Sequence, residues 1–221
     1  MKKLNCENYL ERRQADEKKV ELVEKFIDMI YKVHGLDFVR VNDAVLQKRG
    51  IDVVLNQDGK IFCIDEKFAI KHLDKMINTF GFELWSRNNY NHEGWFSSKS
   101  MLTTHYCLLW AVADEDFSKI KSYDMFIVSK EKIMNFAKES GYYSGIEQDF
   151  MHYWDNRKIL ERDERYYGLG NRENFRRYMR LDNGCKIVQS VSFYEQPINI
   201  LIPKDVLAEM AERKFSYHTD F

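Results

Sequence analysis

The chain has 221 residues, of which 44% are apolar and 31% are charged, and its formal net charge is -1. This length and composition predict one folded domain with a substantial core, and they exclude a largely disordered chain. The net charge also excludes a uniformly basic nucleic-acid-binding protein, so any nucleic-acid-binding surface must be local.

The cysteines are widely separated and form no Cys-x-x-Cys pair: Cys6, Cys63, Cys107 and Cys185. This spacing argues against a structural zinc site, and reduced thiols are expected. The N-terminal sequence contains no apolar signal segment, and no apolar run reaches membrane-spanning length. We therefore expect a cytoplasmic protein without a membrane partner.

The first predicted element is a helix from about Gln14 to Tyr31, followed by a strand over residues 36–41 and a polar connection over residues 42–49. Gly35 is expected to end the helix. Apolar residues recur at helical spacing and form one stripe, which should pack on a sheet: Val20, Val23, Phe26, Ile27 and Ile30.

Residues 50–67 contain two apolar runs around the polar segment 56–59, which includes Asp-Gly and predicts a β-hairpin. Because side chains alternate along a strand, Asp65 and Lys67 share one face and Glu66 lies on the other. Asp52 lies on the partner strand. It can approach Asp65 if the register allows, because facing side chains sit about 5 Å apart.

Carboxylates in such apolar strands require an explanation, because an ionised carboxylate is costly to bury unless it is paired or bound to metal. One interpretation is an ion pair of Lys67 with Asp65 or Asp52 at a solvated end of the sheet. The other is a Mg²⁺ site, because this ion keeps several waters and needs few protein ligands.

Asp52, followed after the turn by Asp65-Glu66-Lys67, resembles the signature of the PD-(D/E)XK nuclease superfamily. Ile51 stands where the name of the motif has proline, a departure that many members of the superfamily share. The resemblance covers roughly residues 15–130. It implies an α/β, restriction-endonuclease-like fold with a central mixed sheet flanked by helices.

The resemblance further implies a nuclease that hydrolyses phosphodiester bonds, with DNA as the expected substrate, and that depends on Mg²⁺ or Mn²⁺. Asp52 and Asp65 would hold the ion, helped by the carbonyl of Glu66, and Lys67 would orient the attacking water. In nucleases of this type the first helix often lends an acid to the site. Glu24 is the candidate by geometry, and the alternative is an acid on a solvated flank of the helix.

Further strands are expected at residues 79–85, 106–112 and 122–128, and the run 106–112 is apolar on both faces, which predicts a central strand. Glu83 would reach the carboxylates if its strand pairs beside the strand that carries Asp65. A helix is predicted from Ser129, its N-cap, to about Glu139, which continues an α/β architecture.

Residues 142–180 are rich in aromatic and arginine side chains, a composition that favours a nucleic-acid-binding surface. Acids interleave with the arginines, so a salt-bridged helical surface is an equal alternative. Strands at 185–188 and 198–202 and a helix from Pro203 to about Arg213 complete the chain. We predict a single domain over 1–221, with a nuclease-like core at about 15–140 and an aromatic, arginine-rich elaboration at about 141–221.

Two other functions stay open. The chain could be a catalytically inactive nuclease-like fold that binds nucleic acid or protein, or an interaction protein that docks a partner through residues 142–180. A homodimer is compatible with either function and with the nuclease. The sequence contains no Gly-x-Ser-x-Gly elbow, no Gly-rich phosphate loop and no dinucleotide fingerprint, which argues against serine hydrolases and nucleotide-binding enzymes.

Overall fold

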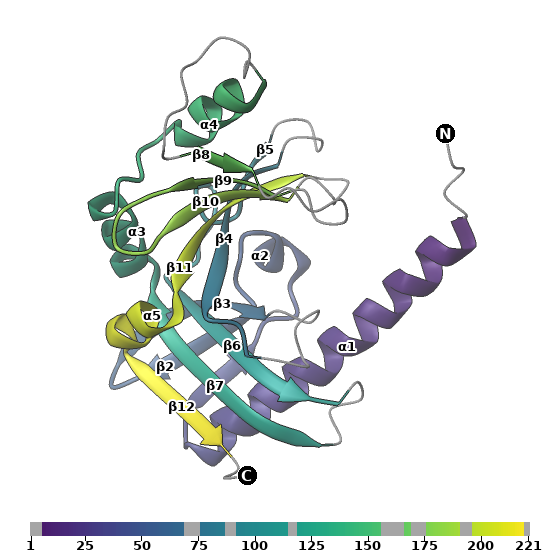
Figure 1. Ribbon diagram of the computed structural model, residues 1–221. Coiled ribbons are helices and arrows are strands. Elements are labelled where there is room, and N and C mark those ends of the chain that lie inside the picture. Colours follow the sequence, from purple (N-terminus) through teal and green to yellow (C-terminus); the bar gives the residue numbers. More distant parts are fainter. Residues whose placement is uncertain are drawn as a thin grey trace.

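The structure, a computed structural model, describes residues 6–68, 76–86, 92–114, 119–155, 166–168, 176–190 and 196–218, with helix α1 described at the side-chain level from Lys18 onward. The described residues form a mixed α/β protein that contains two six-stranded sheets (Figure 1). None of the described helices combines the length and apolarity that crossing a membrane would require.

The first sheet carries the candidate site and has the strand order β1-β2-β3-β6-β7-β12. Its strands are β1 (Asp37–Arg40), β2 (Val53–Gln57), β3 (Lys60–Phe68), β6 (His105–Ala113), β7 (Ile120–Ser129) and β12 (Arg213–His218). β3 and β6 are parallel, and every other neighbouring pair is antiparallel. The sheet is therefore mixed, as predicted.

β6 lies inside this sheet and is buried on both faces, which confirms the central strand predicted from its apolar sequence. Tyr106 and Leu108 pack into the core on one side of the sheet, whereas Cys107 and Leu109 pack into the core on the other side. A strand covered on both faces has no solvated side to which polar residues could turn.

The C-terminal part of helix α1 (Cys6–Val33) packs on one face of the first sheet, and its N-terminal part extends beyond the sheet (Figure 1). The predicted apolar stripe is confirmed, because Val23, Phe26, Ile27 and Ile30 are buried against β2, β3, β6 and β7. The helix ends at Val33, and Gly35, the predicted glycine at its C-terminal end, follows with a φ of +65°. It begins earlier in the sequence than the predicted start at Gln14.

The second sheet packs on the opposite face of the first and has the order β5-β4-β11-β10-β9-β8, with all neighbours antiparallel. Its strands are β4 (Thr79–Ser86), β5 (His92–Glu93), β8 (Tyr166–Gly168), β9 (Arg176–Arg180), β10 (Lys186–Ser190) and β11 (Pro197–Pro203). The helices α3 (Lys130–Glu139), α4 (Ile146–Asp155) and α5 (Lys204–Met210) contribute to the same core.

Three predictions about the chain need correction. The expectation for Glu83 is wrong, because β4 pairs with β5 and β11 in the second sheet instead of joining β3. The connection at residues 42–49 contains a short helix, α2 (Ala44–Lys48), which Asp43 caps. The last helix ends at Met210, and β12 then returns to the first sheet beside β7.

Candidate functional site

The hairpin of β2 and β3 brings the two predicted aspartates opposite each other. Val53 pairs with Ile64, and the strands are joined by a turn at Asp58 and Gly59, whose φ angles of 51° and 76° suit a tight hairpin turn. The N–H of Asp52 donates to the carbonyl of Ile64 at 2.8 Å. The register on which the predicted approach of Asp52 to Asp65 depended is therefore present.

Asp65 is only 1% exposed, although it is a carboxylate. Its Oδ1 accepts a hydrogen bond from Lys67 Nζ. Its Oδ2 is also buried and has no hydrogen-bond donor among the described residues. Burial raises the pKa of Asp65 to about 6, the charge of Lys67 opposes this rise, and the nearby Asp52 carboxylate adds to it.

Asp52 is half-buried and is held by the backbone of both neighbouring strands. Its Oδ2 accepts a hydrogen bond from the N–H of Glu66 at 2.8 Å, and its carbonyl accepts one from the N–H of Val41 at the same distance. These bonds fix the Asp52 side chain beside Asp65, so that the two carboxylates form one acidic pair at the end of the hairpin.

Gly50 lies against this pair and has no room for a side chain. A Cβ atom at this position would lie 2.3 Å from Thr103 Oγ1 and 3.4 Å from Asp65 Oδ2, and the φ of Gly50 is +74°. Thr103 Oγ1 donates to the Gly50 carbonyl at 2.8 Å. The glycine thus lets the chain pass directly beside the unpartnered oxygen of Asp65.

Lys67 lies on the same side of the sheet as Asp65 and is 27% exposed at its side chain. Its Nζ is 4.8 Å from the centroid of the Trp95 ring, a cation–π distance. Trp95 in turn packs edge-on against Tyr106, which pairs with Asp65 in the register of β3 and β6. The ammonium is therefore held between a carboxylate and an aromatic face.

Glu66 points to the other face of the sheet and is not available to this pair through its carboxylate. Arg40 Nη1 donates to Glu66 Oε2 at 2.9 Å, and Arg40 Nε donates to Asp28 Oδ1 at 3.2 Å. Burial raises the pKa of Glu66 to about 7, and Arg40 opposes the rise. Among the atoms of Glu66, only the main chain is placed to serve a ligand on the Asp65 side.

Glu24 belongs to α1, which packs on the face of the first sheet opposite the Asp65 side chain, and of the two aspartates it is Asp52 that acts on its pKa. Burial raises its pKa, the charge of Arg40 lowers it and that of Asp52 raises it. Arg40 Nη2 also donates to the carbonyl of Glu24 at 3.4 Å. Glu24 is therefore half-buried beside Arg40 and Asp52, which does not fit an acid on a fully solvated flank.

The donor set on the Asp65 side fits a hard divalent cation. It consists of carboxylate oxygens, one of which is buried without a partner beside Gly50, where a Cβ atom would lie 3.4 Å from it. Within the described ranges, no group of three or more His, Cys, Asp and Glu side chains is arranged to hold a metal. Two carboxylates suffice for an ion that keeps several of its waters, as Mg²⁺ does.

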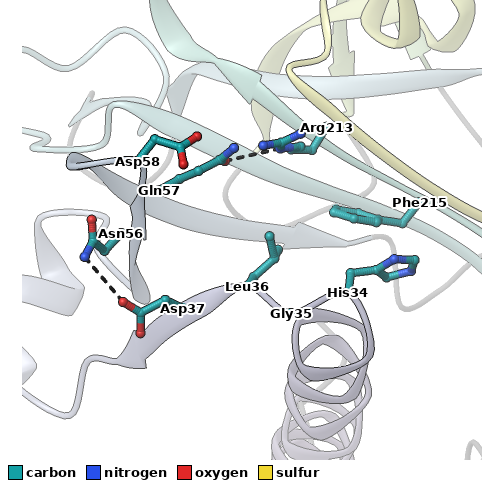
Figure 2. A pocket seen from close by; sticks show the side chains of 9 residues that line it. All are labelled: His34, Gly35, Leu36, Asp37, Asn56, Gln57, Asp58, Arg213 and Phe215. Atoms are coloured by element: carbon teal, nitrogen blue, oxygen red, sulfur yellow. Dashed lines mark hydrogen bonds between the residues drawn. The ribbon is translucent and has the colours of Figure 1, made fainter.

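A polar pocket of about 490 Å³ lies at the turn end of the hairpin, away from Asp52 and Asp65 (Figure 2). Arg213 Nε donates to Gln57 Oε1 at 3.2 Å across it, and Asn56 Nδ2 donates to Asp37 Oδ2 at 3.3 Å. The pocket lies between β12 and the β2–β3 turn, and none of the residues that line it belongs to the candidate site.

The segment 142–180 differs from the predicted nucleic-acid surface where it is described. Tyr142, Phe150 and Trp154 are buried in the core between the sheets, so they cannot stack on bases. Most of the arginine-rich part lies outside the described residues: this holds for Arg162, Arg165 and Arg172 and for the side chain of Arg176. The guanidinium carbon of Arg177 lies 5.7 Å from the centroid of the Trp154 ring, a cation–π distance.

The sequence interpretation missed three residues that contact β3 next to the acidic pair: Arg40, which binds Glu66, Trp95, which lies against Lys67, and Tyr106, which pairs with Asp65. Arg40 had a usable signal, because alternation places it on the same side of its strand as Phe38, which packs against the core beneath α1. A charged residue at such an inward position needs a buried partner. Trp95 and Tyr106 had no comparable signal, because aromatic residues near strands are usually core.

Comparison with known proteins assigns no family to the chain: no family model, no curated protein and no solved structure matches it. The geometry of the site is therefore the basis on which a function can be proposed.

Proposed function

We propose that this chain is a metal-dependent nuclease that hydrolyses phosphodiester bonds, with DNA as the expected substrate, and that its first sheet is the core of a restriction-endonuclease-like fold. The observation that carries the proposal is the state of Asp65. A buried carboxylate has one oxygen on Lys67, the other oxygen without a donor among the described residues, and a second carboxylate beside it.

Asp52 and Asp65 would hold Mg²⁺ or Mn²⁺, and the carbonyl of Glu66 is a further candidate ligand. Bound there, the ion would neutralise charge on the phosphate and increase the acidity of a water molecule. Asp65 is suited to this role because its pKa of about 6 leaves it ionised at neutral pH, while its burial makes that charge costly where Lys67 alone offsets it.

Lys67 would take the second role. Its ammonium is partly exposed, is restrained by Asp65 and rests on Trp95. From this position it would orient the attacking water and donate to a phosphoryl oxygen as negative charge develops there. The partly buried surroundings strengthen both interactions relative to bulk water.

Arg40 would act from the opposite face of the sheet by limiting the negative charge around the site. It binds Glu66 and Asp28 and lies close to Glu24. Without this cation, several acids would repel the carboxylates of Asp52 and Asp65 and raise their affinity for protons. Arg40 is thus a positioning residue that does not touch the substrate.

The test is cleavage of plasmid and linear duplex DNA by the purified protein in Mg²⁺, in Mn²⁺ and in EDTA. We expect cleavage that needs the metal, and a loss of at least about 100-fold in rate for Asp65→Asn and Lys67→Ala. Asp58→Asn is the matched control, because Asp58 is an exposed acid on the turn of the same hairpin. It should cleave as the unmodified protein does.

Two results would contradict the proposal. Folded Asp65→Asn and Lys67→Ala proteins that cleave at the unmodified rate would remove both residues from the reaction. No cleavage by the unmodified protein, together with a shift of DNA mobility on a gel, would favour the alternative of a nuclease-like fold that binds nucleic acid without cutting it.

A further inference from the structure

We infer that Lys130 is a second lysine of this site, which binds a backbone phosphate of the nucleic acid on the far side of Asp65 from Lys67. The inference rests on the proposed function and extends it, because it defines the direction in which the substrate backbone crosses the sheet. It concerns a residue that the motif at Asp52 and Asp65 does not include.

Main-chain hydrogen bonds determine the place of Lys130. It is the first residue of α3, directly after β7 and the N-cap Ser129. Its N–H donates to the carbonyl of Thr104 at 2.8 Å, and the N–H of Thr104 donates to the carbonyl of Cys63 at 2.9 Å. Lys130 is therefore level with Cys63, which precedes Asp65 by two positions in β3, whereas Lys67 follows Asp65 by two positions.

Lys130 also begins a helix on the correct face of the sheet. Cys63, Asp65 and Lys67 share one face by alternation. Helix α3 packs on that face, because its Ile133 lies in the same core cluster as Tyr106, the partner of Asp65 in the register. The backbones at Lys130 and at Cys63 are two strand spacings apart, about 10 Å, and the Lys130 side chain spans part of this distance, so that the charge of Asp65 acts on it.

The electrostatics of Lys130 are those of a cation that lacks an anion. It is half-buried, burial lowers its pKa, and the charge of Asp65 counteracts that shift. No ion pair joins Lys130 to an acid within the part of the chain that the structure describes. By contrast, Lys132, two residues further along α3, forms an ion pair with Glu212, with 3.1 Å between Nζ and Oε1.

Two lysines that bracket an acidic pair suit a polyanion that runs along β3. Lys67 restrained by Asp65 would meet the phosphate that reacts, and Lys130 would meet a neighbouring phosphate of the same strand. A contact of this kind contributes to binding without entering the reaction. It also contributes to salt dependence, because each phosphate neutralised by a lysine releases counterions.

The experiment measures binding of a fluorescent duplex oligonucleotide by anisotropy over a series of KCl concentrations in the presence of Ca²⁺. We expect Lys130→Ala to weaken binding about 3- to 10-fold and to reduce the slope of log Kd against log salt concentration by about 1. Lys130→Arg should recover most of the affinity. Lys138→Ala, an exposed lysine in the last turn of the same helix, should change neither quantity.

Steady-state cleavage in Mg²⁺ by the same variants adds a second readout. Lys130→Ala should raise KM with little change in kcat, whereas Lys67→Ala should lower kcat. An unchanged affinity and salt slope for Lys130→Ala would overturn the inference, as would a loss in Lys130→Arg equal to that in Lys130→Ala.

Failure of the inference and failure of the proposed function give different results. If the unmodified protein cleaves DNA but Lys130→Ala binds as well as it does, Lys130 is excluded and the nuclease stands. If the unmodified protein does not cleave, but the Lys130→Ala variant has a reduced slope of log Kd against log salt concentration, the nuclease is excluded and the phosphate contact stands. An unmodified protein that binds no DNA overturns both.

Discussion

Asp65 and Glu66 are consecutive residues of β3, yet their carboxylates lie on opposite faces of the first sheet and bind different cations. Asp65 meets Lys67, and Glu66 meets Arg40, which also binds Asp28 of α1. Two consecutive residues of one strand therefore differ in role: Asp65 is available to a ligand, whereas Glu66 binds Arg40 of β1, which in turn binds Asp28 of α1.

The substitution Asp65→Asn should abolish cleavage and stabilise the protein at pH 8. The pKa of Asp65 is about 6 in the fold, above its ordinary 3.8. Between these values the folded state binds more protons than the unfolded state, so stability falls as the pH rises through this window. A pKa difference of this size corresponds to at most about 3 kcal/mol at pH 8.

Urea unfolding of the unmodified protein and of Asp65→Asn at pH 4 and pH 8 checks this. The advantage of the variant should be largest at pH 8 and should shrink toward pH 4, and Asp58→Asn on the exposed turn is the control. A variant that is less stable than the unmodified protein at pH 8 would show that Asp65 contributes to folding stability instead of opposing it.

Adding MgCl2 should raise the melting temperature of the unmodified protein at pH 8, with NaCl at equal ionic strength as the control. A ligand that binds only the folded state at ten times its Kd stabilises by about 1.4 kcal/mol. Asp52→Asn and Asp65→Asn should lose the shift. Since Asp65 takes up a proton as the pH falls through about 6, the shift should also disappear at pH 5. An equal shift in all proteins would place the ion elsewhere.

Arg40→Met should destabilise the protein by about 3 to 5 kcal/mol, because it leaves the buried Glu66 carboxylate without its cation. The double variant Arg40→Met, Glu66→Gln removes the orphaned charge and should recover part of the loss. Chemical denaturation of the two variants measures the difference. A single variant as unstable as the double variant would mean that the lost contacts of Arg40 with Asp28 and Glu24 dominate.

Asp124→Asn should destabilise the protein at pH 7 and have less effect in acid. Asp124 on β7 accepts hydrogen bonds from Lys204 of α5, from Ser216 Oγ at 2.5 Å and from His218 Nε2 at 3.1 Å when that nitrogen carries a proton. Burial raises its pKa, but these bonds, led by that from Lys204, outweigh burial and lower it. A lowered pKa gives stability that is lost as the pH falls through it.

Thermal unfolding of Asp124→Asn and of the unmodified protein at pH 7 and pH 3 gives the comparison, with an expected difference of about 1 to 3 kcal/mol at pH 7. Asp205→Asn, an exposed acid in the first turn of α5, serves as the control. A difference that is the same at both pH values would exclude ionisation of Asp124 as its origin.

Local sequence patterns were sufficient for the elements that carry the acidic pair. The turn at Asp58 and Gly59, the alternation through Asp65 and Lys67, and the apolar stripe of α1 each depend on residues close together in the chain. The approach of Asp52 to Asp65 follows from the hairpin register alone. For this reason it could be predicted without knowing the remaining fold.

Pairing between distant segments could not be predicted in the same way. β4 is paired with β11, so that Thr79 faces Pro203, and no periodicity within either strand specifies this partner. The incorrect expectation for Glu83 followed from that gap. Arg40, Trp95 and Lys130 come from three other segments of the chain, and their proximity to Glu66, Lys67 and Asp65, respectively, is a property of the tertiary fold.

The position of β12 at the edge of the first sheet affects how the protein is made. Residues 213–218 supply the strand that pairs with the edge of β7, so this sheet is completed only after residue 218 has left the ribosome, although its other strands end at residue 129. A nascent chain that pauses before residue 213 would already contain the acidic hairpin, while β7 would present unpaired N–H and C=O groups to other chains. Delayed synthesis of residues 213–218 would therefore favour aggregation of a chain in which the other strands of this sheet have already formed.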